Sequence, residues 1–277
     1  MASEQTPDLG TCLIDKPLGT CPAPGRKAKA AIATLKPFEM MYRVCEPGLP
    51  AIYRHTRKIL TKIAETESAP ADRPMDMLDI GGRKSHYTIG VPAHITITDL
   101  PRRNATQHHL HLGFNQEVIS SIRKRRSNVR HVVIDDMTHS SLSTGSFDCA
   151  VAVEVLEHVH DDLAFVGEVR RVLKPDGVFV MTTPNGDYVK NTNPDHKRHY
   201  RRSELEILLR SEFDSVDVRW AIPTSRFYWM ALRAWSWRRP LVTAKAYVGG
   251  VVNLVEDRYT ERPSDGSGMQ ELIAVAR

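Results

Sequence analysis

The chain has 277 residues, of which 41% are hydrophobic and 26% are charged. This length and composition suit one globular domain with a real core plus an appended segment. The formal net charge of +5 is too small to indicate a dedicated nucleic-acid-binding protein. The longest unbroken apolar stretches fall far short of the roughly 20 residues that cross a bilayer, which excludes a transmembrane protein.

The cysteine content and the first residues of the chain indicate the cellular compartment in which we expect the protein. The first ten residues carry Glu4 and Asp8 and no apolar segment, so we expect no secretory signal. The four cysteines form no CxxC pair and are too sparse for a disulfide scaffold or a zinc site. Three neighbouring histidines, His108, His109 and His111, lack the spaced partners of a metal shell. We therefore expect a cytoplasmic protein without a bound metal.

The first quarter of the chain is predicted to lie outside the main domain. Residues 1–29 are rich in Pro, Gly, Thr and Lys with no apolar period, which predicts a poorly ordered arm. Residues 30–74 are predicted to form a helical cap and linker. Apolar residues recur at helical spacing over 51–65, and two prolines mark 66–74 as the linker. The main domain is then expected over 75–277.

Within that domain, short apolar runs alternate with segments of helical periodicity. A helix predicted over 164–173 ends at the turn 174–177, because its proline and glycine stop helices. A second helix is predicted over 203–210. The strand candidates are 77–80, 95–98, 132–134, 149–153, 178–181, 216–220 and 272–276.

Strands that alternate with helices pair in parallel through right-handed crossovers. We therefore predict an α/β protein with a Rossmann-like, doubly wound, mostly parallel seven-stranded sheet and helices on both faces. In such sheets, ligands bind beyond the carboxyl ends of the strands. Candidate functional residues are sought there.

Acidic residues follow three of the predicted strands. Asp79 ends the first strand and precedes Gly81 and Gly82, whose lack of a side chain allows a sharp turn and a close approach to a ligand. Asp99 ends the second strand, about 20 residues after the glycines, where nucleotide-binding sheets hold a ribose diol. Asp136 follows the third strand. We expect these carboxylates to converge at one edge of the sheet.

Two segments around the fourth and fifth strands carry a family resemblance. Residues 146–159 read SFDCAVAVEVLEHV and residues 168–177 read EVRRVLKPDG. They resemble the class I S-adenosylmethionine-dependent methyltransferases, in particular a small-molecule branch with an "FD, strand, LEH, helix, R-x-L-K-P-G-G" signature. The resemblance spans roughly 75–210. It implies S-adenosylmethionine as the cofactor, methyl transfer as the activity, and an antiparallel last strand.

The resemblance also implies roles for individual residues along the strand ends. Asp79, Gly81 and Gly82 would form the loop around the methionine part of the cofactor, and Asp99 would hold the ribose hydroxyls. The adenine would lie against Leu100 and Met137 with its amino group at Asp136, and Glu154 would line the sulfonium end.

This chain departs from the family pattern D-x-G-x-G-x-G in its glycine loop. Arg83 and Ser85 stand where the pattern has glycine, which costs some close approach of backbone to ligand. A cofactor carboxylate could instead be met by Arg83 or Lys84.

Three histidines are candidates for the general base that a hydroxyl acceptor would need. Methyl transfer mainly requires alignment of the acceptor with the S–CH3 bond at about 3 to 3.5 Å, and His is the usual base near neutral pH. His158 follows the fourth strand, where it could equally close the turn before the next helix. His196 and His199 lie in a loop dense in His, Lys and Arg. Such a loop is costly to bury, so we favour a substrate-facing role.

Two further segments admit more than one interpretation. The basic run 123–126 ends a helical stretch over 116–122, where cations favour the helix C-terminus; it is either solvated surface or a contact for RNA or phosphate. The predicted insertion at about 223–265 mixes aromatic residues with arginines, as in a lid, accessory packing or a membrane interface. We favour lid or accessory packing, because Pro240 and the pair 249–250 should interrupt a long amphipathic helix.

The sequence thus predicts methyl transfer from S-adenosylmethionine to a small-molecule acceptor, with a hydroxyl preferred over nitrogen or carbon. Two alternatives stay open. An RNA or protein methyltransferase would show a continuous basic face and strongly salt-dependent binding. A catalytically inactive binding module would fail to bind the cofactor. We expect no nucleic-acid partner, and the sequence predicts neither the acceptor nor the oligomeric state.

Overall fold

The computed structural model describes residues 35–71, 73–102, 113–233, 235, 238–260 and 263–277. The chain divides into two units, Met1–Ala31 and Ile32–Arg277, and everything below concerns the second. The predicted arm and the histidines of 108–111 lie outside the described residues.

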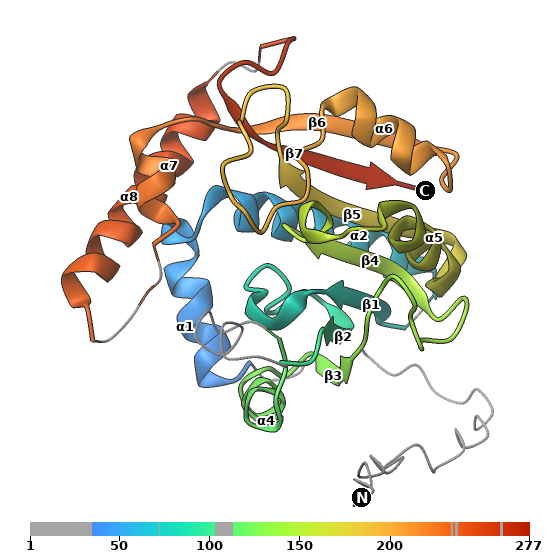
Figure 1. Ribbon diagram of the computed structural model, residues 1–277. Helices are drawn as coiled ribbons and strands as arrows, with labels where there is room; N and C mark the ends of the chain where they lie inside the picture. The colour runs from blue at the N-terminus through green and yellow to red at the C-terminus, as the bar shows by residue number, and fades with distance from the viewer. Residues whose placement is uncertain (1–34, 72, 103–112, 234, 236–237, 261–262) are drawn as a thin grey trace, which may run out of the picture. The chain divides into compact units, whose positions relative to one another are not determined.

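The second unit is built on a seven-stranded sheet with the strand order β3-β2-β1-β4-β5-β7-β6 (Figure 1). Strands β1 to β5 pair in parallel, whereas β7 runs antiparallel between β5 and β6. The predicted sheet and its antiparallel last strand are therefore confirmed. The strands are β1 (Met75–Ile80), β2 (Ala93–Asp99), β3 (Val129–Ile134), β4 (Phe147–Val153), β5 (Leu173–Pro184), β6 (Val216–Pro223) and β7 (Met269–Ala276).

Both faces of the sheet are buried by helices. Neighbouring strand residues such as Met77 and Leu78 enter two different apolar clusters, because successive side chains of a strand point to opposite faces. One cluster includes Leu60 of α2 (Ala51–Ala71), and the other includes Phe165 of α5 (Asp162–Val172) and Leu205 of α6 (Arg202–Arg210). This burial explains why the strands read as nearly continuous apolar runs.

The N-terminal cap has more helix than the sequence predicted. Helix α1 (Pro37–Cys45) was not predicted, and η1 (Glu46–Gly48) joins it to α2. The predicted linker is wrong over residues 66–71, which continue α2. Residues 66–69 contain neither proline nor glycine, so the helix runs on and ends one residue past Pro70.

The turn predicted over 174–177 is also different in the structure. Strand β5 begins at Leu173, which pairs with Phe147 of β4, and its register shifts before Val178 pairs with Cys149. Helix α5 therefore ends at Val172, and the proline and glycine lie in an irregular first part of the strand.

Helices α7 (Arg226–Ala231) and α8 (Pro240–Tyr259) form the insertion before β7. The prediction that two glycines would interrupt a long helix is wrong, because Gly249 and Gly250 lie inside α8, whereas Pro240 does mark a helix boundary. Pro240 lies at the start of α8, where its missing N–H costs nothing. A Cβ on Gly250 would lie 2.1 Å from the carbonyl oxygen of Gly48. Gly250 thus lets α8 pack tightly on η1, while Gly249 faces Met230 and Ala231 of α7. These contacts offset the low helix propensity of both glycines.

The helices in the described ranges include none that is long and apolar enough to span a membrane. Trp229 of α7 is exposed, whereas Tyr228 beside it is buried and faces the residues discussed below. Trp237 lies outside the described residues.

Candidate active site

The carboxyl ends of the parallel strands meet at one edge of the sheet. Asp79 near the end of β1 pairs with Ile97 of β2 and Val151 of β4, and Asp99 at the end of β2 pairs with Ile134 of β3. The backbone N–H of Asp135 donates to the carbonyl of Asp99 at 3.1 Å. The acidic residues predicted to converge therefore follow adjacent strands at the same edge.

The loop after β1 depends on its two glycines. Gly81 has a φ of +66°, and a Cβ there would lie 2.7 Å from a methyl carbon of Val155. A Cβ on Gly82 would lie 2.5 Å from the Asp79 carboxylate. Both positions therefore exclude larger residues. The loop leads into the short helix η2 (Gly82–Lys84), the only helix between β1 and β2.

Asp79 shapes this loop from inside. Its carboxylate is fully buried and accepts hydrogen bonds from the hydroxyls of Tyr87 and Thr88 at 2.9 and 2.8 Å. Burial raises the pKa of Asp79, while the Arg126 cation and these hydrogen bonds lower it. The Asp79 carboxylate thus holds the loop from inside, and its place in a cofactor loop stays a prediction.

Ser85, one of the two departures from the glycine pattern, forms hydrogen bonds within the loop and with Arg126. The Ser85 hydroxyl donates to the Gly82 carbonyl at 2.6 Å. Arg126 donates to the carbonyl and hydroxyl oxygens of Ser85, both at 3.2 Å, and to Thr88 at 2.7 Å. Arg126 follows helix α4 (Gln116–Arg125) and is buried. The interpretation of the whole basic run as solvated surface is therefore wrong at this residue.

Asp99 and Leu100 lie at the end of β2, where Asp99 is half-buried and Leu100 is exposed. The Asp99 carboxylate is partly exposed and accepts a hydrogen bond from the backbone N–H of Leu100 at 2.8 Å. Burial raises the pKa of Asp99, and the nearby Arg83 and Arg102 cations lower it. Leu100 is 46% exposed. Arg83 thus lies beside the predicted ribose position; the side chain of Lys84 is not among those described.

The residues predicted at the adenine differ in accessibility. Asp136 is exposed, and its carboxylate accepts bonds from the backbone N–H and the hydroxyl of Thr138. Met137 is buried in the core cluster with Leu78 and Ile80. The predicted contact of Met137 with the adenine ring stays a prediction.

Glu154 follows β4 in a strained conformation. Its φ is +54°, a region that costs a non-glycine residue of order 1 to 3 kcal/mol and that is typical of functional positions. Its backbone N–H donates to the carbonyl of Thr182 at 3.2 Å, and its carboxylate accepts the Thr182 hydroxyl at 2.9 Å. Strand β5 therefore fixes both its backbone and its side chain.

Two further glutamates lie near Glu154, and the sequence assigned a role to neither. Glu157 in η3 (Leu156–His158) and Glu271 in β7 are buried. The Thr183 hydroxyl donates to Glu157 and the Tyr228 hydroxyl donates to Glu271. Burial, and then the charge of Glu154, raises the pKa of both carboxyls. Over the described ranges, neither Lys nor Arg forms an ion pair with any of the three glutamates.

The cap and the insertion each bring a tyrosine to these carboxyls. Burial, followed by the charges of Glu154 and Glu271, raises the pKa of Tyr53 of α2 to about 12. The pKa of Tyr228 of α7 is raised by burial and by the same two glutamates. Tyrosines from two separate helices therefore adjoin the strand ends. Nothing in their local sequence indicated this.

The three candidate histidines form one cluster. The ring centroids of His158 and His196 are 4.7 Å apart at an interplanar angle of 89°, and Nδ1 of His196 lies 2.9 Å from Nε2 of His199. Burial, with His158 and His199 adding to it, lowers the pKa of His196 to about 4. The backbone N–H of Lys197 donates to the carbonyl of Glu157 at 2.7 Å, so the histidine loop is tied to the end of β4.

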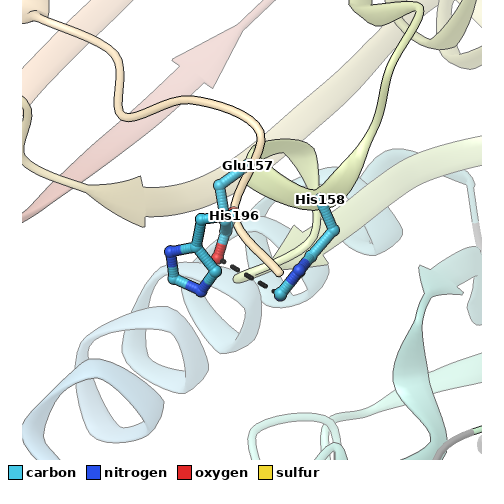
Figure 2. Close-up of side chains that lie close together, drawn as sticks. All are labelled: Glu157, His158 and His196. Atoms are coloured by element: carbon cyan, nitrogen blue, oxygen red, sulfur yellow. Dashed lines mark ion pairs between the residues drawn. The ribbon is translucent and has the colours of Figure 1, made fainter. Parts of the chain in front are cut away.

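Glu157 joins this cluster as a candidate metal ligand. One ligand atom from each of Glu157, His158 and His196 lies within 4.8 Å of the other two. Figure 2 shows the three side chains turned toward one another, with the first two from η3 and the third from the loop after β5.

Comparison with known proteins agrees with this geometry. A family model described as "Methyltransferase domain" matches residues 89–181. A "Probable S-adenosylmethionine-dependent methyltransferase" of Mycolicibacterium smegmatis is 33% identical over 115 residues, which cover 39% of this chain and 44% of that protein. These similarities support a class I S-adenosylmethionine-dependent methyltransferase domain over the matched part of this chain. The cofactor of this methyltransferase family is S-adenosylmethionine.

Other similar proteins bear on the fold and on the acceptor. A "Ubiquinone biosynthesis O-methyltransferase" of Xanthomonas campestris is 27% identical over 176 residues, covering 57% of this chain and 70% of that protein. The structure of Haemonchus contortus phosphoethanolamine N-methyltransferase 2 with phosphomonomethylethanolamine and S-adenosylhomocysteine has a TM-score of 0.50 and 15% identity. It covers 78% of this chain and 52% of that chain, and this likeness concerns the fold. The chain spans about half the length of the first curated relatives that it matches.

Proposed function

We propose that this methyltransferase transfers the methyl group of S-adenosylmethionine to a hydroxyl group of a small molecule. The observation that carries the proposal is the position of Glu154. It lies between the strand ends that carry Asp99 and Asp136 and the cluster that holds His196 and His199. Cofactor residues and proton-accepting residues therefore share one edge of the sheet.

The residues at the ends of β1 and β2 fit the cofactor. The glycine loop makes a tight turn in which a Cβ would clash with Val155 or Asp79. Partly exposed Asp99 can accept hydrogen bonds from the ribose hydroxyls, and exposed Leu100 can lie on the adenine. Asp136 would accept the adenine amino group. When bound, the cofactor supplies a methyl group already activated by a positively charged sulfur.

The Glu154 side of the edge would receive the acceptor. The acceptor oxygen uses a lone pair to form the new bond to the methyl carbon, the C–S bond breaks, and its electron pair stays on sulfur. The hydroxyl proton leaves the acceptor. His196, whose lowered pKa of about 4 keeps its imidazole neutral near pH 7, can accept this proton and pass it to solvent water. The similarity to an O-methyltransferase also supports oxygen as the acceptor atom.

Two observations favour a small molecule over a nucleic acid. Arg126 is buried against Ser85, and Lys36 donates to the backbone carbonyls of Arg123 and Arg126 at 2.9 and 3.0 Å. One member of the basic run, Arg126, is thus buried inside the protein, which argues against a continuous basic face. The hydrogen bonds around Ser85 likewise weaken the case for an inactive module, since they build an ordered loop in place of the missing glycines.

The proposal is tested by transfer of an isotopically labelled methyl group. The full chain is incubated with labelled S-adenosylmethionine and panels of phenols, aliphatic alcohols, carboxylic acids and amines, and the products are identified by mass spectrometry. We expect label in an ether linkage to one class of hydroxyl compound. Label only in amines, in carbon positions or in added RNA would overturn the hydroxyl assignment. Cofactor binding without transfer to any panel member would favour the binding module.

A further inference from the structure

The cluster of Glu157, His158 and His196 consists of hydrogen-bond acceptors that face one another. Nδ1 of His158 lies 3.1 Å from the carbonyl oxygen of Asp195. A carbonyl can only accept, so Nδ1 carries the hydrogen and a neutral His158 has its lone pair on Nε2. That Nε2 lies 4.0 Å from Oε1 of Glu157.

A second chain of hydrogen bonds fixes the tautomer of His196. Nδ1 of His199 lies 2.9 Å from the carbonyl oxygen of Val189, so this nitrogen must donate. Nε2 of His199 is then an acceptor, and it receives the hydrogen from Nδ1 of His196 at 2.9 Å. A neutral His196 therefore also has its lone pair on Nε2.

Oε1 of Glu157 is the third acceptor. This side chain is fully buried, and Oε1 has no hydrogen-bond partner among the described residues. In its ionised form, a buried carboxylate oxygen without a partner is costly, and the lone pair on Nε2 of His158, 4.0 Å away, adds repulsion. A cation between the three atoms would remove both penalties.

The backbone holds these three side chains in place. The N–H of Lys197 donates to the carbonyl of Glu157, and Arg198 donates to the Asp162 carboxylate and to the His160 carbonyl at 2.5 and 2.8 Å. Both segments are thus tied together before any ligand arrives. Such preorganisation is what metal sites require.

We propose that Glu157, His158 and His196 bind a divalent transition-metal cation through one carboxylate and two Nε2 atoms. One carboxylate and two imidazoles are a ligand set of catalytic zinc and non-haem iron sites, which keep open positions for a substrate oxygen. One ligand atom from each of the three residues lies within 4.8 Å of the other two (Figure 2). Small side-chain rotations would bring each to metal–ligand distances of about 2.0 to 2.2 Å.

His199 is then a positioning residue. Metal-bound histidines usually use their second ring nitrogen for a hydrogen bond that fixes the ring and the tautomer, and His199 accepts that bond from His196. The expectation of a chain without a metal, drawn from cysteine and histidine spacing, missed this set because its ligands come from η3 and from a loop 38 residues further along.

The inference rests on the proposed function for its consequence in catalysis. A cation here would lie beside Glu154, bind the acceptor oxygen through an open position and lower the pKa of its hydroxyl. Because His158 and His196 would then bind the cation through Nε2, the proton would leave to solvent water and not to either imidazole. The same edge of the sheet would thus hold the methyl donor and the cation that activates the acceptor.

The test uses the full chain stripped with a chelator. Mn²⁺, Co²⁺, Zn²⁺ and Mg²⁺ are titrated by calorimetry, and bound metal is counted by elemental mass spectrometry. We expect one transition-metal ion per chain and weaker binding of Mg²⁺, which prefers oxygen ligands. Glu157→Gln and His196→Ala should each weaken binding at least tenfold, and His199→Ala about tenfold. His160→Ala, an exposed neighbour in the same region, should bind as the wild type does.

Failure of the metal site and failure of the proposed function are separable. The metal site would be overturned if the folded wild type bound no stoichiometric metal, or if Glu157→Gln and His196→Ala both kept the wild-type metal affinity. This holds even if the protein binds S-adenosylhomocysteine and transfers methyl groups in the presence of chelator. Conversely, the wild type could bind stoichiometric metal that the variants lose, and yet bind no S-adenosylhomocysteine. That result would support the metal site and contradict the methyltransferase function. His196 lies in a loop, so its variant stays informative if the buried Glu157 variant fails to fold.

Discussion

The two ends of strand β4 treat their acidic residues in opposite ways. Near its start, Asp148 accepts hydrogen bonds from Arg73 and Lys174, both at 2.7 Å, and from the backbone N–H of Asp76 at 2.8 Å. Just after its end, Glu154 and Glu157 are surrounded by hydroxyls, histidines and another carboxyl. At the start of β4, Arg73 and Lys174 compensate the charge of Asp148. After its end, none of the described Lys or Arg residues forms an ion pair with Glu154 or Glu157.

The pKa shifts follow this difference. Partial burial of Asp148 raises its pKa, but the bonds from Arg73 and Lys174 outweigh it and the net shift is downward. Burial raises the pKa of Glu154 and Glu157, and no cation offsets it. Balanced charges stabilise a fold, whereas grouped acids with raised pKa values cost stability and are typical of functional sites. The amino end of β4 thus serves the fold, and we assign the carboxyl end to function.

The largest expected effect concerns His199. Replacing it by alanine in His199→Ala removes the partner that orients His196, so turnover should fall about 100-fold, within the range for assisted proton transfer. The affinity for S-adenosylhomocysteine should stay within twofold. Steady-state rates and calorimetry check both values.

Asp148→Asn is the matched control at the other end of β4. Its turnover should stay within twofold of the wild type. If His199→Ala were fully active, or if Asp148→Asn lost as much turnover, the functional division between the two ends would fail.

A smaller effect is expected for the stability of Glu271→Gln. The folded-state pKa of Glu271 is raised, so the wild type loses stability as the pH rises from the unfolded value of about 4.3 toward the folded value. Glutamine does not titrate and can still accept from Tyr228. The variant should therefore gain about 1 to 2 kcal/mol relative to the wild type between pH 5 and pH 8, measured by urea unfolding.

A wild type that gains stability relative to Glu271→Gln as the pH rises would contradict the raised pKa. Favourable interactions would then offset the cost of burying the ionised carboxyls near Glu154.

The smallest effect is the loss of stability in Asp148→Asn. The folded-state pKa of Asp148 is lowered, so its stabilisation is present above the unfolded value of about 3.9 and is lost as the pH falls through the folded value. A largely solvent-screened ion pair supports a loss of about 0.5 to 1 kcal/mol at pH 7. The difference should shrink below pH 3. A difference that instead grows in acid would show that Asp148 acts through packing.

The sheet was predicted well from the sequence, because strands that are buried on both faces need apolar side chains on both faces. Each predicted strand is an apolar run such as the one at 149–153, and all seven form. The cap and the insertion were predicted less well. Local propensity counts Gly250 as a helix breaker, whereas its contact with Gly48 exists only once α8 has packed on η1.

The candidate site was predictable where it follows strand ends. Asp99, Glu154 and His196 came from position and family resemblance, and the structure places them at one edge. Glu271 and Tyr228 were missed, because tertiary packing brings them to Glu154 from distant parts of the chain. A glutamate inside the apolar strand 269–276 was the one available signal, since a buried carboxyl needs a reason.

The central claim is that the carboxyl edge of the sheet binds the adenosyl cofactor. Calorimetric titration of S-adenosylhomocysteine into the wild type, Asp99→Ala and Asp148→Asn tests it most directly. We predict one binding site per chain, a loss of about 1.5 to 3 kcal/mol of binding free energy in Asp99→Ala, and wild-type affinity in Asp148→Asn. Equal affinity of all three proteins, or no binding by the folded wild type, would contradict the claim.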